Sequence, residues 1–347
     1  MDKISIYDVA KHAKVSQSTV SRVLNNYPYI KAATKEKVLN AIKELGYSPN
    51  EIARGLANNK TNTIGLIIED ISNSFYSETA QTILREARKY NYEVIIIDSE
   101  SDPDNFKKSV DSLTAKRVDG IIVASTRMTN DIIVNLIDRK FPIITYNRRI
   151  YKEGYNRHVV LDNYVGATMA IKHLVELNHK RIAYISGPLK FSTFYDRLQG
   201  FLSSIHTYNL EVDEELMYMD KLEYKKVYQF AKQLMNSQNP PTAYFSSTDN
   251  MALAIMEAAV SEGLKIPQDI SVIGCDDIDI SGNSFIQLTT IAQQKEKMAT
   301  LAIENLMKQI GVEDVNDDID IVIQPQLILR KTTGEAKEGG CWINESI

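Results

Sequence analysis

The sequence has two cysteines, one tryptophan and no long apolar run. Cys275 and Cys341 form no Cys-x-x-Cys motif, which argues against a disulfide framework and against a thiolate metal site. The longest stretch without a charged residue, 233–248, is short and polar, and charges stand near residue 1 where a signal peptide would need an apolar core. We therefore expect no membrane association, no bound metal and a location in the reducing cytoplasm.

Several catalytic signatures are also missing. No two glycines lie two or four positions apart, so neither G-x-G-x-x-G nor G-x-S-x-G occurs, and G-K-[ST] and H-E-x-x-H are absent as well. The five histidines show no ligand spacing, and we expect His173 and His179 to lie on the surface. The pattern predicts a protein without catalytic residues or a cofactor rather than an enzyme.

The composition is that of a folded chain with an uneven charge. The 347 residues are 44% hydrophobic and 24% charged, which predicts a soluble protein of two or three domains. Residues 1–60 carry 10 Lys and Arg against 5 Asp and Glu, whereas residues 61–347 carry 30 against 40. A small basic head on an acidic body is typical of proteins in which only the head contacts nucleic acid.

Three helical patterns occupy the head. Ser5 and Asp8 form a capping box for a helix from about residue 6 to 13, and Ser16 begins a second helix with Val20, Val23 and Leu24 on its inner face. We expect Thr34 to cap a third helix that ends at Gly46. The second helix keeps a polar outer face with an arginine, which predicts a helix-turn-helix that enters the DNA major groove. A generic three-helix bundle is the alternative.

The segment that follows, residues 48–60, begins with a capping box but is too short for a stable isolated helix, and it contains Gly55. We interpret it as a linker that becomes helical on DNA and against a second copy of the chain.

The head resembles the LacI/GalR family of transcription regulators. The resemblance rests on Asp8-Val9-Ala10, on Thr19-Val20-Ser21-Arg22-Val23-Leu24-Asn25, and on Tyr47-Ser48-Pro49-Asn50 with Ala53-Arg54-Gly55-Leu56. One departure is Lys14, which stands in the turn where the family usually has glycine. The resemblance implies that Gln17, Ser18 and Arg22 read base edges and that Leu56 enters the minor groove beside Ala53. The full set of DNA-binding residues that it implies is Tyr7, Ser16, Gln17, Ser18, Thr19, Ser21, Arg22, Asn25, Ala53 and Leu56.

From residue 62 onward, short apolar runs alternate with amphipathic stretches. Two successive series of this kind, one from 64 to 146 and one from 159 to 274, predict two doubly wound α/β lobes with parallel sheets. In such sheets a ligand lies beyond the carboxyl ends of the strands. The adjacent Asp276 and Asp277 should then make one ligand contact and one structural contact, because neighbouring residues of a strand point to opposite sides.

The body resembles the periplasmic-binding-protein-like effector domain of the same family, through Ser72-Asn73-Ser74-Phe75, Asp196-Arg197-Leu198-Gln199-Gly200-Phe201 and Ile266-Pro267-Gln268-Asp269-Ile270-Ser271-Val272-Ile273-Gly274 among other segments. The fold class is thus an all-α helix-turn-helix head joined to an α/β body of two doubly wound lobes. We expect the head at 1–47, the hinge at 48–61, the first lobe at 62–161 plus 291–320, the second lobe at 162–290 plus 321–333, and a disordered tail at 334–347.

The resemblance places an effector between the lobes, in contact with Phe75, Tyr146, Arg148, Arg197, Thr248 and Asp276. We expect Asp249 to cap the helix that begins at residue 250. Cys275 and Leu222 stand where relatives have aromatic residues, so the stacking platform for a sugar would have to come from Phe194 or Tyr195.

These features predict a homodimeric repressor that binds a pseudo-palindromic DNA operator and responds to a small molecule, a sugar or sugar derivative. Some members of the family use a corepressor or dock a phosphoprotein, and that mode stays open. An α/β protein that binds or modifies sugars and carries an incidental helical head is the alternative function.

Overall fold

The computed structural model describes residues 4–24, 27–47, 60–311 and 318–337. Contacts between residues divide the chain into two compact units, Met1–Thr61 and Asn62–Ile347. We call the described part of the first unit the head and that of the second unit the body, and each is described by itself.

The head consists of three helices around a small apolar core. They are α1 (Ile6–His12), α2 (Gln17–Leu24) and α3 (Ala32–Leu45). Val9, Val20 and Val38, one from each helix, are fully buried together. The apolar positions recur at helical spacing, so each helix turns one face inward and leaves its polar face to solvent.

Local capping sets the helix ends of the head. The amide of Asp8 donates to Ser5 Oγ and the amide of Ser5 donates to the Asp8 carboxylate, which is the expected capping box. Lys14 has a φ of 55°, so a lysine adopts the left-handed turn conformation that favours glycine. The prediction for α3 was wrong at its start, because the helix begins at Ala32 after Lys31 and Thr34 lies inside it.

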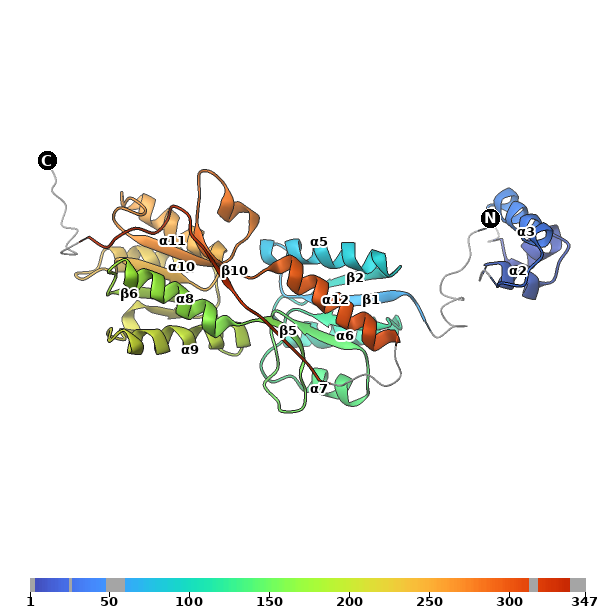
Figure 1. Cartoon of the computed structure of the whole chain (residues 1–347), viewed down its shortest axis with the longest axis horizontal. Helices are drawn as coiled ribbons and strands as arrows, with labels where there is room; N and C mark the ends of the chain where they lie inside the picture. The colour runs from blue at the N-terminus through green and yellow to red at the C-terminus, as the bar shows by residue number, and fades with distance from the viewer. Residues whose placement is uncertain (1–3, 25–26, 48–59, 312–317, 338–347) are drawn as a thin grey trace. The chain divides into compact units, whose positions relative to one another are not determined.

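The body contains two six-stranded sheets (Figure 1). The first has the order β11-β5-β4-β3-β1-β2, and all its strands are parallel. Its strands are β1 (Thr63–Ile68), β2 (Glu93–Asp98), β3 (Gly120–Val123), β4 (Ile143–Tyr146), β5 (Arg157–Leu161) and β11 (Ile319–Ile323). Helices α5 (Ser74–Lys89) and α12 (Lys295–Gly311) pack on one face, and α6 (Pro103–Ala115) and α7 (Asp131–Asp138) pack on the other.

The second sheet has the order β12-β10-β9-β8-β6-β7, with β12 antiparallel to β10. Its strands are β6 (Ile182–Ser186), β7 (Met217–Met219), β8 (Ala243–Ser246), β9 (Ser271–Asp276), β10 (Thr289–Ala292) and β12 (Gln326–Ile328). Helices α8 (Asn163–Glu176) and α9 (Ser192–Thr207) cover one face, and α10 (Tyr224–Met235) and α11 (Asp249–Ser261) cover the other. Two 3₁₀ helices, η1 (Glu214–Leu216) and η2 (Asp279–Gly282), complete the lobe.

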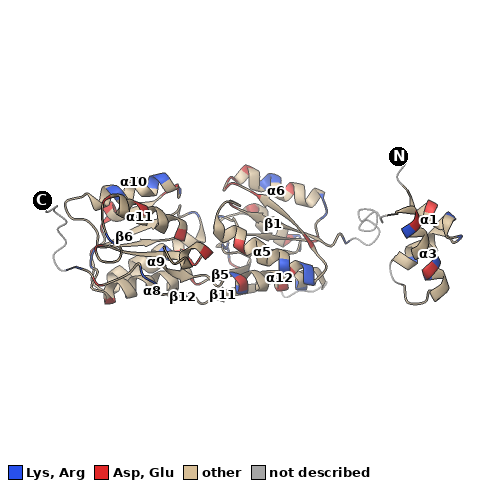
Figure 2. Cartoon of the chain, turned by 90° about the horizontal axis from the view of Figure 1, so that it is seen from above, with Lys and Arg blue, Asp and Glu red and all other residues tan. Residues whose placement is uncertain are grey.

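Charge follows this layering. Strands β1 and β6 contain no Asp, Glu, Lys or Arg, whereas helices such as α6 and α12 carry charges of both signs (Figure 2). Strands covered on both faces need continuous apolar sequence, which is why the short Ile- and Val-rich runs fold into parallel sheets.

The chain crosses between the lobes three times, and two of the expected boundaries are wrong. The first crossing follows β5, which ends at Leu161, but β10 keeps the chain in the second lobe as far as Ala292 rather than 290. The last crossing falls between Ile323 and Gln326, because β11 still pairs with β5 and only β12 returns to the second sheet. The expected limit at residue 320 would cut through β11.

Two side chains of the second lobe are more buried than predicted. Asp249 is 0% exposed and accepts hydrogen bonds from the Ile278 amide at 3.0 Å, the Ser281 hydroxyl at 2.6 Å and the Thr290 hydroxyl at 2.5 Å. The residue that caps α11 is Thr248, whose Oγ1 accepts from the Met251 amide. Likewise His179 is buried and lies 2.9 Å from both Thr242 Oγ1 and Ser271 Oγ.

Among the described residues, none of the helices combines the length and apolar character that spanning a membrane requires.

The Asp249 network yields a stability prediction. Asp249→Ala leaves three buried donors without their acceptor, and at roughly 1–3 kcal/mol each we expect the body to lose about 3–5 kcal/mol of unfolding free energy. The neighbouring control Thr248→Ala removes one helix cap and should cost about 1 kcal/mol. Urea unfolding of the body followed by circular dichroism measures both, and equal losses would contradict the assignment of Asp249 to the core.

Candidate functional site

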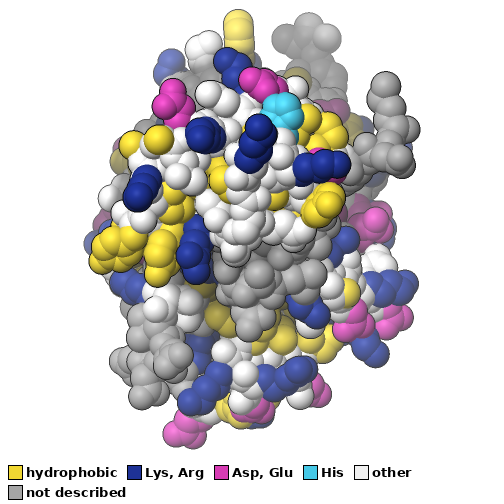
Figure 3. Space-filling view, turned by 90° about the vertical axis from the view of Figure 1, so that its right-hand side faces the viewer, with side chains coloured by type: hydrophobic (Ala, Val, Ile, Leu, Met, Phe, Trp, Pro, Cys, Tyr) yellow, Lys and Arg dark blue, Asp and Glu magenta, His cyan; other side chains and the backbone are white. Residues whose placement is uncertain are grey.

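The outer face of α2 carries exposed polar side chains. Gln17, Ser18 and Arg22 are exposed, as is Tyr7 on α1. The Arg22 guanidinium lies 5.7 Å from the centre of the Tyr27 ring, which orients a long side chain that would otherwise be mobile. A space-filling view of one side of the chain shows Lys and Arg side chains scattered among apolar, uncharged and acidic ones (Figure 3).

Some of the other residues of the head that are expected to bind DNA also stabilise the start of α2. Ser16 Oγ accepts from the Thr19 amide at 3.2 Å and lies 2.8 Å from Thr19 Oγ1, so both residues shape the start of α2. Ser21 is half-buried on the same helix. Asn25, Ala53 and Leu56, with the hinge, lie outside the described residues.

A cavity of about 690 Å³ lies between the two lobes and is lined by residues of both. Many lining residues directly follow the carboxyl end of a strand: Glu69 follows β1, Asn147 and Arg148 follow β4, and Thr248 stands just beyond β8. The carboxyl ends of the two sheets therefore meet at one cleft, as the topology requires. Of the expected effector contacts, Phe75, Arg148, Arg197, Thr248 and Asp276 line this cavity.

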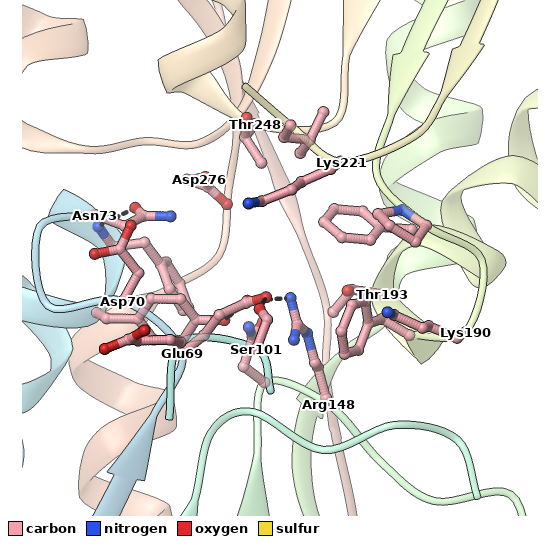
Figure 4. Close-up of a pocket in the computed structure, with 18 of the residues that line it drawn as sticks. Glu69, Asp70, Asn73, Ser101, Arg148, Lys190, Thr193, Lys221, Thr248 and Asp276 are labelled. Atoms are coloured by element: carbon pink, nitrogen blue, oxygen red, sulfur yellow. Dashed lines mark hydrogen bonds and ion pairs between the residues drawn. The ribbon is translucent and has the colours of Figure 1, made fainter. Parts of the chain in front are cut away.

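Arg148 is held from two sides in the cleft. Its Nη2 donates to Glu69 Oε2 at 2.5 Å, and its guanidinium lies 3.8 Å from the centre of the Phe191 ring (Figure 4). Glu69 also accepts from the Tyr76 hydroxyl at 2.8 Å and from the Ser101 hydroxyl. Burial alone would raise the pKa of Glu69, but Arg148 and the hydroxyl donors together lower it below its ordinary value, so the pair is ionic.

Asp276 ends β9 with an unusual backbone. Its φ is 135° and that of Asp277 is 52°, conformations that cost energy for residues with a side chain. Asp277 is fixed by Arg330 at 2.6 Å, and Lys295 donates to its carbonyl oxygen, while Asp276 accepts from Gln293 Nε2 inside the cleft. Asp276 thus lines the cavity, whereas Asp277 is held by Arg330 and Lys295.

Arg197 and Thr248 are only partly available to a ligand. Arg197 is buried, its Nε donates to Asn163 Oδ1 at 2.9 Å and its Nη1 donates to the Ser247 carbonyl. The Thr248 hydroxyl is already the acceptor of the α11 cap. Both residues therefore support the wall of the cleft as well as lining it.

Aromatic rings form the apolar part of the wall. Phe75, Phe191 and Phe194 line the cavity, whereas Tyr195 is not among the lining residues. Tyr146 was expected to contact the effector, but it is fully buried outside the lining and stacks behind Phe75 with ring centres 6.3 Å apart. Gly187 makes room for Phe194, because a Cβ there would lie 2.3 Å from the Phe194 ring.

Sequence reasoning missed several lining residues, of which Glu69 and Phe191 are the most consequential. Glu69 was detectable as a charged residue directly after a buried strand. Phe191 lies in a loop after β6, where no periodic signal exists. Within the described ranges, no cluster of three or more His, Cys, Asp or Glu side chains is arranged to hold a metal ion.

Two family models match the chain in agreement with this architecture. Residues 5–50 match "Bacterial regulatory proteins, lacI family", and residues 171–333 match "Periplasmic binding protein-like domain". Catabolite control protein A of Priestia megaterium is 34% identical over 317 residues, which cover 91% of this chain and 95% of that protein. The chain belongs to the LacI family of bacterial regulatory proteins. It is a DNA-binding transcriptional regulator and not an enzyme.

Further relatives are similar to this LacI-family chain over nearly its full length. The transcriptional repressor PurR of Histophilus somni is 34% identical over 94% of this chain and 98% of its own. Among solved structures, the Lac repressor dimer bound to operator and the anti-inducer ONPF aligns with a TM-score of 0.85 and 28% identity over 96% of this chain and 100% of that one. The complex of the transcriptional regulator CelR with cellobiose aligns with a TM-score of 0.71 and 25% identity, covering 95% and 99% of the two chains. The predicted fold class is confirmed.

The buried position of Asp276 predicts that the stability of the folded protein depends on pH. Burial, with a smaller contribution from Asp249, raises the pKa of Asp276 to about 7 in the folded protein, against an ordinary value of 3.8. Because the folded state prefers the protonated form, stability should fall as pH rises from about 4 to 7. Asp276→Asn mimics the neutral acid, so its stability advantage over the wild type should be about 2 kcal/mol larger at pH 8 than at pH 5.

Urea unfolding of the full chain at pH 5, 6, 7 and 8 measures this difference. Asp279→Asn is the matched control, because Asp279 is an exposed carboxylate three residues away and shows no such burial. A difference between Asp276→Asn and wild type that stays constant with pH would show that Asp276 titrates normally.

Proposed function

We propose that this chain represses transcription from a pseudo-palindromic operator and that a small molecule bound between the lobes controls its affinity for DNA. The observation that carries the proposal is a polar cleft built from the strand ends of both lobes, in a chain whose head presents an exposed polar helix. The relatives named PurR are repressors, which supports the direction of regulation. As a DNA-binding protein it would act in the cytoplasm.

On the DNA side, we propose that Gln17, Ser18 and Arg22 read base edges in the major groove, because they are the exposed residues at the start and middle of α2. Tyr7, Ser16, Thr19, Ser21 and Asn25 would contact the backbone or hold α2 in place. Ala53 and Leu56 of the hinge would contact the minor groove, a role that rests on the family resemblance alone.

We further propose that two copies of the chain act together. A pseudo-palindromic operator offers two equivalent half-sites, which a two-fold symmetric dimer matches with one head each. The Lac repressor structure that aligns with this chain is a dimer on its operator, which supports this arrangement.

The lobes are tied across the cleft by bonds that a ligand would strengthen or break. Asn250 donates to Asn73 Oδ1 at 3.3 Å, the Asp279 amide donates to Glu78 at 3.1 Å, and Arg149 pairs with Asp196 at 3.2 Å. A ligand that contacts both lobes through Phe75, Arg148, Arg197, Thr248 and Asp276 changes the balance of these bonds and hence the angle between the lobes. Couplings of about 1–3 kcal/mol are usual for such linkage and correspond to roughly 5–150-fold in affinity.

The class of ligand that we propose is a saccharide or a saccharide derivative. The CelR structure was solved with cellobiose, and its chain aligns with nearly all of this one. A phosphoprotein corepressor, which the family resemblance leaves open, is the alternative mode of control.

The reading role of Arg22 is testable with a panel of operator variants. Arg22→Ala should weaken specific binding by about 1–3 kcal/mol and relax preference at one base pair, because a bidentate contact to guanine is lost. Lys108→Ala removes the same charge from an exposed position on α6 of the body. It should change neither the affinity for the operator nor the base preference. Band shifts at fixed salt measure both, and equal effects of the two substitutions would argue against base reading by Arg22.

The assignment of DNA binding to the head and of ligand binding to the body is testable by removing the head. Residues 62–347 alone should keep the thermal shift that a screen of sugars, sugar phosphates and purines gives for the full chain, and should lose binding to any inverted-repeat DNA. Retained operator binding by this fragment would contradict the assignment of the head. Turnover of a saccharide by the fragment would instead favour a sugar-modifying function.

A further inference from the structure

The turn between α2 and α3 leaves two tyrosine rings in solvent. Tyr27 is 53% exposed and Tyr29 is 86% exposed. Neither ring belongs to the apolar core of the head, in which Val9, Val20 and Val38 are fully buried. Burial of apolar surface within the head therefore does not explain why two aromatic side chains stand side by side next to the helix with the exposed polar face.

The turn is anchored at both ends, so the two rings have defined places. The Tyr27 amide donates to the Arg22 carbonyl at 3.0 Å, which ties the first residue of the turn to α2. At the other end, Ile30 is half-buried and packs against the apolar core of the head. Between the two tyrosines, Pro28 restricts its own backbone φ. Tyr27 and Tyr29 are therefore presented by a short segment with little backbone freedom.

The side chains of this turn make a series of contacts that ends at Arg22. The rings of Tyr29 and Tyr27 meet edge to face, with their centres 6.1 Å apart and an angle of 68° between their planes. The Arg22 guanidinium lies over the Tyr27 ring, with its central carbon 5.7 Å from the ring centre. A cation within about 6 Å of a ring centre is attracted by the π electrons. Tyr29 thus restrains the Tyr27 ring, and the Tyr27 ring restrains Arg22.

The contact with a ring holds Arg22 without using its hydrogen-bond donors. In the part of the chain that the structure describes, no carboxylate forms an ion pair with the Arg22 guanidinium, and Glu44 of the head pairs with His12 instead. A carboxylate would accept hydrogen bonds from the planar guanidinium, whereas a ring face attracts the cation and leaves its N–H groups available. Arg22 can therefore be held by Tyr27 and still make a bidentate contact with guanine.

We infer that Tyr27 is a positioning residue for base reading, which restrains the Arg22 side chain before DNA binds, and that Tyr29 supports the Tyr27 ring. The family resemblance places neither tyrosine among the residues that contact DNA. The inference rests on the proposed function, because it concerns the arginine that we propose reads a base. A long side chain that is restrained in advance loses less conformational entropy on binding, so removal of the Tyr27 ring lowers both affinity and selectivity.

The test uses the full chain and the inverted repeat that the wild type enriches from a pool of random DNA duplexes. Band shifts on this duplex, and on duplexes in which each base pair of the half-sites is changed in turn, measure the affinity and the preference at every position. Tyr27→Leu should lose about two- to fivefold in affinity, which is the size of an exposed cation–π contact. Its preference should weaken at the base pair where Arg22→Ala loses preference, and the other positions should keep theirs.

A conservative variant separates the positioning of Arg22 from a direct contact of Tyr27 with DNA. Tyr27→Phe keeps the ring face and removes the hydroxyl, so it should bind like the wild type. If Tyr27→Phe instead loses as much affinity as Tyr27→Leu, and loses it equally on every duplex, the hydroxyl contacts the DNA backbone and the inference is overturned. Tyr29→Leu should cause a smaller loss at the same base pair. Tyr208→Leu removes an exposed ring from the body and should change neither affinity nor preference.

A double-mutant cycle measures the link between the ring and the arginine. Tyr27→Leu should not weaken binding further when it is added to Arg22→Ala, because the ring then has no guanidinium to restrain. Equal losses from Tyr27→Leu in the presence and in the absence of Arg22 overturn the inference. Circular dichroism should show the helix content of the wild type in each variant, since the rings are exposed. A loss of helix content in Tyr27→Leu would assign the ring to the stability of the head and would also overturn the inference.

The same band shifts distinguish failure of the inference from failure of the proposed function. If the wild type enriches no inverted repeat, or if Arg22→Ala keeps the full base preference of the wild type, the proposed reading of DNA by Arg22 fails and the inference fails with it. If Arg22→Ala loses preference at one base pair and Tyr27→Leu keeps it, the positioning role of Tyr27 alone fails.

Discussion

The opposed carboxyl ends of the parallel strands in the two sheets are the constraint on which the functional cleft depends. Each βα unit ends its strand with a polar turn, and the chain crosses between the lobes so that both sets of turns line one cavity. Glu69, Arg148, Thr248 and Asp276 are distant in sequence and become neighbours only because their strands end at this place. A ligand in the cleft therefore contacts both lobes at once, which is the condition for sensing their relative position.

The bonds around the cleft are individually small and suit a switch. The bonds from Asn250 to Asn73 and from Arg149 to Asp196 are partly exposed and join opposite lobes, so each contributes about 1 kcal/mol or less. A few contacts of this size are comparable with the coupling energies that regulators use. By contrast, the fully buried Asp249 network lies within one lobe and holds the ends of β9 and β10 to the start of α11.

The fold was largely predictable from the sequence, whereas the site was only partly so. Apolar runs and helix caps are local signals, and they predicted the helices of the head and eight of the described strands, whereas β7, β10, β11 and β12 were not predicted. Thr34, Asp249 and His179 show where local signals fail. Thr34 lies inside α3 rather than at its start, Thr248 rather than Asp249 caps α11, and tertiary packing buries the side chains of Asp249 and His179. Tyr146, which the family resemblance placed at the effector, is fully buried behind Phe75 and does not line the cavity, and Phe191 lies in a loop without periodicity.

The Arg148–Glu69 pair is more readily explained by recognition than by stability. Removing two charges from water costs several kcal/mol each, and a buried pair commonly recovers no more than this cost. The structure nevertheless holds Arg148 between Glu69 and the Phe191 ring and leaves two of its donor nitrogens without an acceptor among the described residues. A rigid arginine with two donor nitrogens left without an acceptor among the described residues presents directional hydrogen bonds to a molecule that enters the cleft.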